Sequence, residues 1–139
     1  MVVVLPTNAG IWKNEDCYSA KICIEEFGGT PSKRVIQQYK YSTGEKTHII
    51  DCDTGDKSIE FDWFEKSLKP DESIGQANRY SVLTGKQATA VLMARESIDQ
   101  DRWELYEKAA KRANVIMYLR SVKPGDILPD YVEKYSSCR

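Results

Sequence analysis

An acidic segment in the middle of the chain holds the side chains whose types and spacing could do chemistry. Five carboxylates fall within twelve residues, the last two on a stretch that alternates apolar and polar residues. Carboxylates at this density can bind a divalent cation or attract a basic partner. The predicted partner-binding residues are therefore Asp51, Asp53, Asp56, Glu60 and Asp62.

The segment from Asp51 to Asp56 also matches the start of two known site types. As a calcium-binding loop it fails, because Gly55 comes one position early and no acid occupies the fifth position. Asp53-Thr54-Gly55 matches the tripeptide of aspartic proteases, but Cys52 precedes it where an apolar run is needed. A hairpin turn is the preferred interpretation. A small divalent-metal-dependent hydrolase at Asp51, Asp53 and Asp56 is the third hypothesis for function.

Cys17, Cys23, His48 and Cys52 are acceptable zinc ligands by type. On a strand, however, His48 and Cys52 would lie about 13 Å apart, whereas ligands of one zinc lie within about 4 Å of each other. No metal site and no cofactor are predicted. The cysteines are expected to be buried or unused thiols in a reducing compartment, with Cys138 exposed in the tail.

No catalytic residue is predicted. His48 is the single histidine, and no nucleophile turn lies near it in the sequence. Thr84-Gly85-Lys86 lacks the features of a phosphate-binding loop and is interpreted as a turn that leads into a helix. These observations favour a protein that is not an enzyme.

A basic and aromatic stretch supports an alternative, a sequence-tolerant binder of single-stranded nucleic acid. Arg34 and Lys40 alternate with Tyr39 and Tyr41, and such mixtures serve stacking and phosphate contact. The alternation places rings and charges on opposite faces, which favours a structural role. The predicted nucleic-acid-binding set is Arg34, Tyr39, Lys40, Tyr41, Lys108, Lys111, Arg112 and Arg120.

Length and charge bound the remaining classes. The chain has 139 residues and a net charge of −1, which predicts one domain with no global attraction to nucleic acid or to a membrane. The apolar run over residues 2–5 stops at Pro6 without basic residues before it, so we expect neither a signal peptide nor a membrane span. A cytoplasmic location is predicted.

The first half of the chain reads as strands separated by short turns. Residues 58–64 alternate most clearly, with Ile59, Phe61 and Trp63 expected to face a core and the polar residues between them to face solvent. The predicted strands are residues 2–5, 18–27, 34–42, 46–53 and 58–64.

The second half reads as helices. Trp103, Tyr106, Ala110, Ala113 and Met117 recur at steps of three and four, which predicts one long helix over residues 101–122 capped by Asp101 or Asp99. A second helix is predicted over residues 86–98 and a helical turn over residues 131–135. Residues 70–78 are predicted to be a linker between a β-rich half, residues 1–69, and a helical half, residues 79–139.

The sequence therefore predicts a single α+β domain over residues 1–139. An antiparallel meander of four to five strands forms its N-terminal half, and two C-terminal helices pack on one face of that sheet. The favoured function is a non-enzymatic protein-binding module, an inhibitor or adaptor that uses the acidic hairpin and exposed aromatic residues. Its expected partner is another protein, and a homodimer remains an open alternative.

Overall fold

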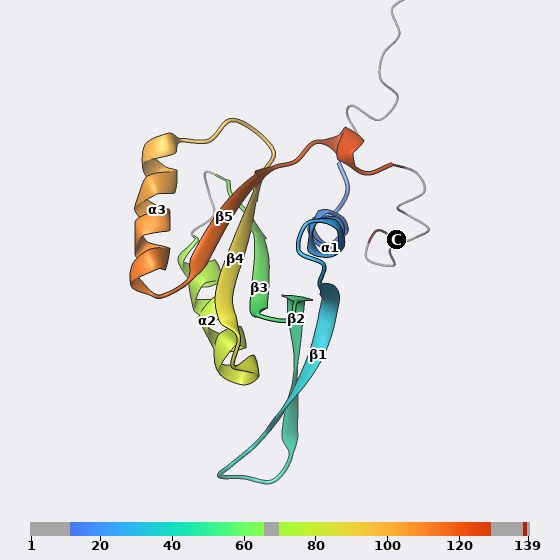
Figure 1. Cartoon of the computed structure of the whole chain (residues 1–139), viewed down its shortest axis with the longest axis vertical. Helices are drawn as coiled ribbons and strands as arrows, with labels where there is room; N and C mark the ends of the chain where they lie inside the picture. The colour runs from blue at the N-terminus through green and yellow to red at the C-terminus, as the bar shows by residue number, and fades with distance from the viewer. Residues whose placement is uncertain (1–11, 66–69, 129–137, 139) are drawn as a thin grey trace, which may run out of the picture.

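The computed structural model of the chain describes residues 12–65, 70–128 and 138. One five-stranded sheet lies between helices on both of its faces (Figure 1). In chain order the elements are α1 (Glu15–Glu25), β1 (Thr30–Gln38), β2 (Glu45–Asp53), β3 (Lys57–Trp63), α2 (Asp71–Thr84), β4 (Gln87–Ala94), α3 (Gln100–Arg112), β5 (Ile116–Ser121) and a 3₁₀ turn, η1 (Pro124–Asp126).

The sheet is mixed. Its strand order is β1-β2-β3-β4-β5, and β1, β2 and β3 pair antiparallel whereas β3, β4 and β5 pair parallel. The α+β class is confirmed, but the purely antiparallel meander is wrong from β3 onwards. Parallel neighbours need a crossover connection, and α2 and α3 supply the two crossovers.

Alternate residues of the central strands pack on opposite faces. Ile59 and Phe61 of β3 join the core cluster that includes α1. Ala90 and Leu92 of β4 join the cluster that includes α2 and α3. Helices α2 and α3 share one face, although one of the two predicted helices, residues 86–98, is strand β4. Helix α1 covers the other face, so the central strands are buried on both sides.

The predicted strand over residues 18–27 is wrong, because this segment lies in helix α1. The Asn14 side chain accepts a hydrogen bond from the Cys17 backbone N–H (2.9 Å), and Glu15 and Asp16 occupy the first turn, where acids favour a helix. These start signals outweigh the apparent alternation of apolar residues.

The predicted linker over residues 70–78 and the predicted helix over residues 86–98 are also wrong. The first forms the start of α2, which follows Pro70 and has Asp71 and Glu72 in its first turn. The second forms β4, whose run of buried residues is typical of a central parallel strand. Gly85 (φ 72°) caps the C-terminal end of α2. The turn around Gly85 therefore follows a helix and leads into β4, whereas it was predicted to lead into a helix.

The predicted helix over residues 101–122 ends early. Helix α3 is capped by Asp99, whose side chain accepts from the backbone N–H groups of Asp101 and Arg102. It ends at Arg112, because Asn114 adopts a left-handed conformation (φ 58°) and the chain turns back as β5. Met117 therefore lies on a strand and not on the helix.

The other strand predictions are largely confirmed. Residues 46–53 and 58–64 match β2 and β3 within a residue. The strand predicted over residues 34–42 is displaced by four residues, since β1 runs from Thr30 to Gln38 and residues 39–42 lie in the following loop. The predictions for residues 2–5 and 131–135 lie outside the described residues.

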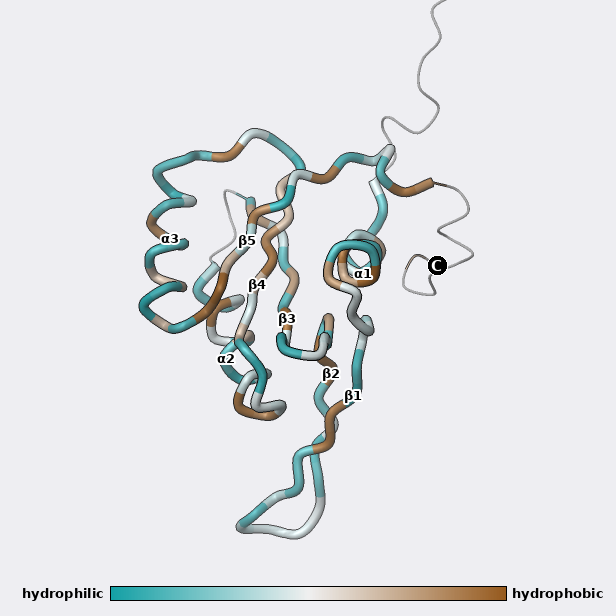
Figure 2. Tube along the Cα trace, in the orientation of Figure 1, coloured by the Kyte–Doolittle hydropathy of each residue, from teal (hydrophilic) through white to brown (hydrophobic). Residues whose placement is uncertain are grey.

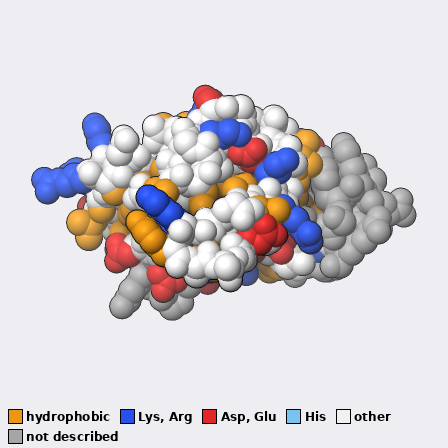
Figure 3. Space-filling view, turned by 90° about the horizontal axis from the view of Figure 1, so that it is seen from below, with side chains coloured by type: hydrophobic (Ala, Val, Ile, Leu, Met, Phe, Trp, Pro, Cys, Tyr) orange, Lys and Arg blue, Asp and Glu red, His pale blue; other side chains and the backbone are white. Residues whose placement is uncertain are grey.

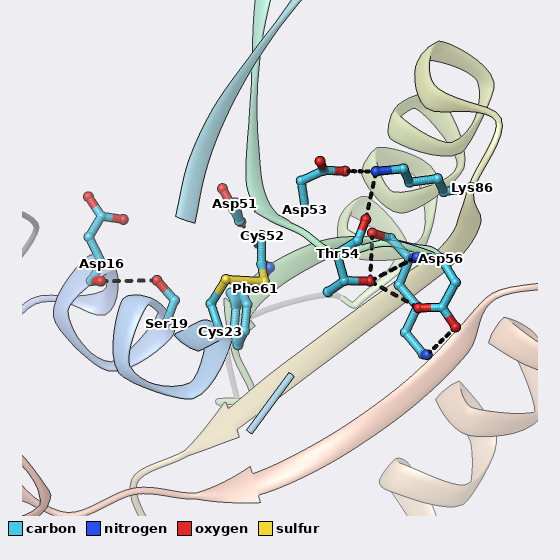
Figure 4. Close-up of a disulfide and its surroundings, with 11 residues drawn as sticks. Asp16, Ser19, Cys23, Asp51, Cys52, Asp53, Thr54, Asp56, Phe61 and Lys86 are labelled. Atoms are coloured by element: carbon cyan, nitrogen blue, oxygen red, sulfur yellow. Dashed lines mark hydrogen bonds and ion pairs between the residues drawn. A yellow bond between two sulfur atoms is a disulfide. The ribbon is translucent and has the colours of Figure 1, made fainter. Parts of the chain in front are cut away.

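The prediction of reduced thiols is wrong. Cys17 is bonded to Cys138 and Cys23 to Cys52, and all four side chains are buried, including that of Cys138. The second disulfide ties α1 to β2 beside Asp51 (Figure 4). Structural disulfides are typical of oxidising compartments, so the cytoplasmic location stays a prediction that these bonds do not favour.

Of the helices in the described part of the chain, none combines the length and the apolar character that crossing a bilayer requires.

Gly29 packs tightly against the Cys23–Cys52 disulfide, and a substitution there tests the fold. A Cβ added to Gly29 would lie 2.5 Å from Cys52 Sγ and 3.0 Å from the Asp53 carbonyl oxygen. Gly29→Ala is expected to lower the free energy of unfolding by about 1–3 kcal/mol, since the disulfide and strand must shift to accept a methyl group. Urea denaturation of the oxidised protein measures this. Gly55→Ala is the matched control, because nothing lies within 4 Å of its added Cβ; equal losses in both variants would contradict this packing.

Candidate functional site

Two carboxylates face each other across the β2–β3 pair. The register pairs Cys52 with Ile59 and Asp53 with Ser58, which places Asp51 opposite Glu60. The Phe61 backbone N–H donates to Asp51 Oδ2 (2.8 Å). The sheet therefore holds two acids side by side and fixes the orientation of one of them.

Helix α2 covers the face of β3 that carries Glu60. Its polar residues Ser73, Gln76, Tyr80 and Thr84 recur at steps of three and four and so form one stripe. The Ser73 hydroxyl donates to Asp62 Oδ2 (2.9 Å) at one end, and Thr84 hydrogen-bonds to Ser58 at the other. A polar helix stripe is thus matched to the polar face of a strand, with Glu60 in the middle.

Glu15 brings a further carboxylate from the start of α1. Burial, and then the charges of Asp62 and Asp51, raise the pKa of Glu15 to about 7, while Arg95 opposes this shift. Desolvation and the repulsion between these like charges both favour the protonated form. Carboxylates from three elements, α1, β2 and β3, therefore form one group, which we call the acidic site: Glu15, Asp51, Glu60 and Asp62.

Glu60 is the most perturbed member of the acidic site. Burial, followed by the adjacent charge of Asp51, raises its pKa to about 10. Burial also raises the pKa of Asp51, although the hydrogen bonds from Phe61 and Glu60 oppose that shift. Near neutral pH Glu60 therefore holds a proton that it can donate to Asp51.

One oxygen of this carboxyl group has no partner. Glu60 Oε2 is buried, and no hydrogen-bonding group among the described residues reaches it. A buried oxygen in this state costs free energy unless a ligand or a solvent molecule satisfies it. Tyr80, whose pKa burial raises above its ordinary value, is a neutral neighbour and adds no compensating positive charge.

An open depression of about 900 Å³ lies where β3 and β4 end, and none of the four residues of the acidic site lines it. Arg95 connects the two, since it lowers the pKa of Glu15 and stacks over Trp63, with 4.1 Å from its guanidinium carbon to the ring centroid. Arg95 also forms an ion pair with Glu65. The depression is lined by Trp12, Phe64, Glu65, Arg95, Glu96, Ser97, Ile98, Asp99 and Arg102.

The five predicted partner-binding acids do not form one exposed surface. Asp51, Glu60 and Asp62 are partly buried beneath α2. Asp53 binds Lys86 (2.8 Å) and exposed Asp56 binds Lys57 (2.9 Å), on the turn that joins β2 to β3 (Figure 4). The face of β3 that was expected to meet solvent is instead covered by a helix.

The predicted nucleic-acid-binding residues fall on three separate elements. Arg34 lies on β1, and Tyr39, Lys40 and Tyr41 lie in the loop that follows it. Lys108, Lys111 and Arg112 belong to α3, while Arg120 on β5 pairs with Glu26. His48, which is hydrogen-bonded to Gln37, lies on the same hairpin as Arg34, three residues before Asp51 on β2.

In their present orientations the acids do not form a finished metal centre. Across the described ranges, no three His, Cys, Asp or Glu side chains are disposed to hold a metal ion. The absence of a zinc site made of Cys and His residues remains a prediction. Of the four residues considered for it, the three cysteines form disulfides and His48 is hydrogen-bonded to Gln37 on the hairpin.

The sequence prediction missed Glu15, Ser73 and Tyr80 as members or neighbours of the acidic site. A signal for the last two was present, since residues 73, 76, 80 and 84 follow a helical period that is polar throughout. Glu15 had no comparable signal, because only the three-dimensional position of α1 brings it to Asp62.

No known protein family, curated protein or solved structure matches this chain.

The raised pKa values predict how stability depends on pH. The folded chain keeps protons on Glu15 and Glu60 that the unfolded chain releases near pH 4.5, so raising the pH favours unfolding. The free energy of unfolding should fall from about pH 5 upwards. Above pH 7 the loss comes from Glu60 and is at most about 1.4 kcal/mol per pH unit, the value for one proton.

Urea unfolding between pH 7 and 9, with a chelator present, measures this slope. Glu60→Gln keeps the shape of the protonated acid and should remove most of it. Glu104→Gln, an exposed position on α3, should leave it unchanged. A wild-type stability that is constant or rises over this range would rule out a buried protonated Glu60.

Proposed function

We propose that the acidic site binds a divalent cation and that the protein is a small metal-dependent hydrolase of phosphate esters. The observation that carries the proposal is the buried, unpartnered Glu60 Oε2 within a group of four carboxylates. This moves the metal-dependent hypothesis from Asp51, Asp53 and Asp56 to Glu15, Asp51, Glu60 and Asp62.

The chemistry of the donors fits a hard cation. All four groups are carboxylates, the ligands that Mg²⁺, Mn²⁺ and Ca²⁺ prefer. Burial and mutual repulsion hold protons on Glu15 and Glu60. A cation held by Asp51, Glu60 and Asp62 would replace the Glu60 proton and lessen the repulsion, which leaves Glu15 as a base. A cation at Glu60 would also satisfy its isolated oxygen.

Binding would require a local rearrangement. The described side chains do not converge as three ligands, so the carboxylates would have to reorient and Glu60 would have to lose its proton. The backbone bond from Phe61 keeps Asp51 in place during this change. Cation binding is therefore expected to be linked to proton release and to strengthen as the pH rises.

A phosphate ester is the substrate class that such a site supports best. Magnesium is commonly held by one or two carboxylates together with substrate phosphate oxygens. The depression where β3 and β4 end offers space, and Arg95 at its edge offers a positive charge. A bound cation would make a coordinated water more acidic. Glu15 would accept the proton of the attacking water as the water oxygen bonds to phosphorus and the P–O ester bond breaks. The leaving oxygen would take a proton from solvent.

Calorimetric titration with Mn²⁺ or Mg²⁺ tests the cation site. Wild-type protein at about pH 8 should bind with release of protons, detected as a heat that changes with the ionisation enthalpy of the buffer. Glu60→Gln and Asp51→Asn should each weaken binding by at least about tenfold. Asp56→Asn, which removes an exposed acid paired with Lys57, is the matched control. Absence of binding in wild type, or equal binding in all variants, would refute the site.

Turnover of a generic phosphodiester, bis-p-nitrophenyl phosphate, tests the reaction separately. Activity is expected with Mn²⁺ and not with a chelator, and Glu60→Gln should lower kcat/KM by at least about a hundredfold. Asp56→Asn should retain full activity. Cation binding without hydrolysis would keep the site and refute the enzyme.

The protein-binding module remains a prediction without support of its own. The acids that would form its surface are divided between a covered site and a turn, as the placement of Glu60 and Asp56 illustrates. No exposed acidic surface common to the five residues therefore exists for a basic partner.

A further inference from the structure

The β1–β2 hairpin projects from the body of the protein. Its two strands pair along their whole length, from Thr30–Asp53 to Gln38–Glu45. Strand β2 joins β3 only at its base, through Cys52–Ile59 and Asp53–Ser58. The outer part of the hairpin is therefore a two-stranded arm that extends past the remaining strands (Figure 1).

This arm has a net positive charge. Residues 30–50 hold four basic residues and one acid, a net charge of +3, whereas the rest of the chain carries −4. The single acid, Glu45, already accepts a hydrogen bond from Gln38 (2.8 Å). Among the described acids none forms an ion pair with Lys33, Arg34 or Lys46, so these charges are available to an anionic partner.

The two faces of the arm differ. The register places Lys33, Gln37, Lys46 and His48 on one face, where Gln37 Oε1 lies 2.8 Å from His48 Nε2. The other face carries Arg34 with the exposed side chains of Ile36 and Ile49. Figure 2 shows the arm as mainly hydrophilic with short apolar segments, and Figure 3, viewed from the hairpin end, shows Lys and Arg side chains on this side of the molecule.

We propose that the arm binds double-stranded nucleic acid by entering a groove as a two-stranded ribbon. The major groove of B-form DNA, about 12 Å wide, admits such a ribbon. The outer part of the arm, from the Lys33–Ile50 pair to the Gln38–Glu45 pair, reaches about 20 Å, which is more than half of one helical turn of the duplex. Lys33 and Lys46 are suited to phosphate contacts. His48, between them along the arm, and Gln37, opposite Lys46, carry hydrogen-bonding groups suited to base edges.

A single strand fits the arm less well. Stacking of successive bases needs several rings along one face, but the tyrosines of the arm lie in its terminal loop. There the ring of Tyr39 lies against Gly44, and Lys40 lies 5.4 Å from the ring centroid of Tyr41. The inference does not rest on the proposed hydrolase, because none of these residues belongs to the acidic site.

Fluorescence anisotropy with a labelled duplex of about 20 base pairs, in a chelator-containing buffer, tests the arm. Wild-type affinity should fall steeply between about 50 and 200 mM salt. The double variant Lys33→Gln/Lys46→Gln should bind at least about tenfold more weakly, with a salt slope lower by about 2. Both side chains are exposed, so thermal unfolding should be unaffected.

Two variants serve as controls. Lys108→Gln/Lys111→Gln removes the same charge from α3 and should change affinity little. Glu60→Gln, which disables the proposed cation site, should bind as wild type and thereby separates the two proposals. Absence of duplex binding at about 50 mM salt would overturn the inference. So would an equal loss in the α3 variant, or tighter binding of a single strand of the same length.

Discussion

The parallel pairing of β3 with β4 is the constraint on which the rest of the structure depends. An antiparallel hairpin would need only a short turn after Trp63, but a parallel neighbour requires the chain to cross the sheet. Helix α2 makes that crossing and lies on the polar face of β3. Residues that a simple meander would leave in water, Ser58, Glu60 and Asp62, are therefore enclosed between strand and helix.

This enclosure changes the chemistry of the acids. A carboxylate in water ionises near its ordinary pKa, whereas Glu60 lies beside Asp51 with little solvent around it and keeps its proton. The matching stripe on α2 satisfies Asp62 and Ser58 at the two ends but leaves Glu60 Oε2 without a partner. The proposed cation would offset this cost at Glu60 Oε2. The projecting β1–β2 arm is separate from the acidic site in position and in charge, so the two proposals concern different elements.

The parts of the fold that local patterns control were predictable from the sequence. Strands β2 and β3 follow from the turns around residues 42–45 and 53–57 and from the alternation between Ile59 and Trp63. Helix α3 follows from the spacing of Trp103, Tyr106 and Ala110.

The errors arose where tertiary pairing determines the secondary structure. The run from Ala88 to Ala94 suits a helix or a buried parallel strand equally well, and only the presence of neighbours on both sides makes it a strand. The site could be predicted in part, since Asp51, Glu60 and Asp62 were named as functional residues. Their burial could not, because it depends on α2, whose first residues resemble a linker.

The pKa of the Glu60 carboxyl group, in the presence and absence of Mg²⁺, tests the account most directly. It can be followed by carbon-13 NMR of the side-chain carboxyl carbons, with Glu60→Gln used to assign the resonance. We predict that Glu60 titrates far above the ordinary value of a glutamate, towards pH 10, in the metal-free protein. Adding Mg²⁺ should move that titration to lower pH, because the cation competes with the proton. Titration of Glu60 near its ordinary value, or a raised value that Mg²⁺ leaves unchanged, would contradict the account.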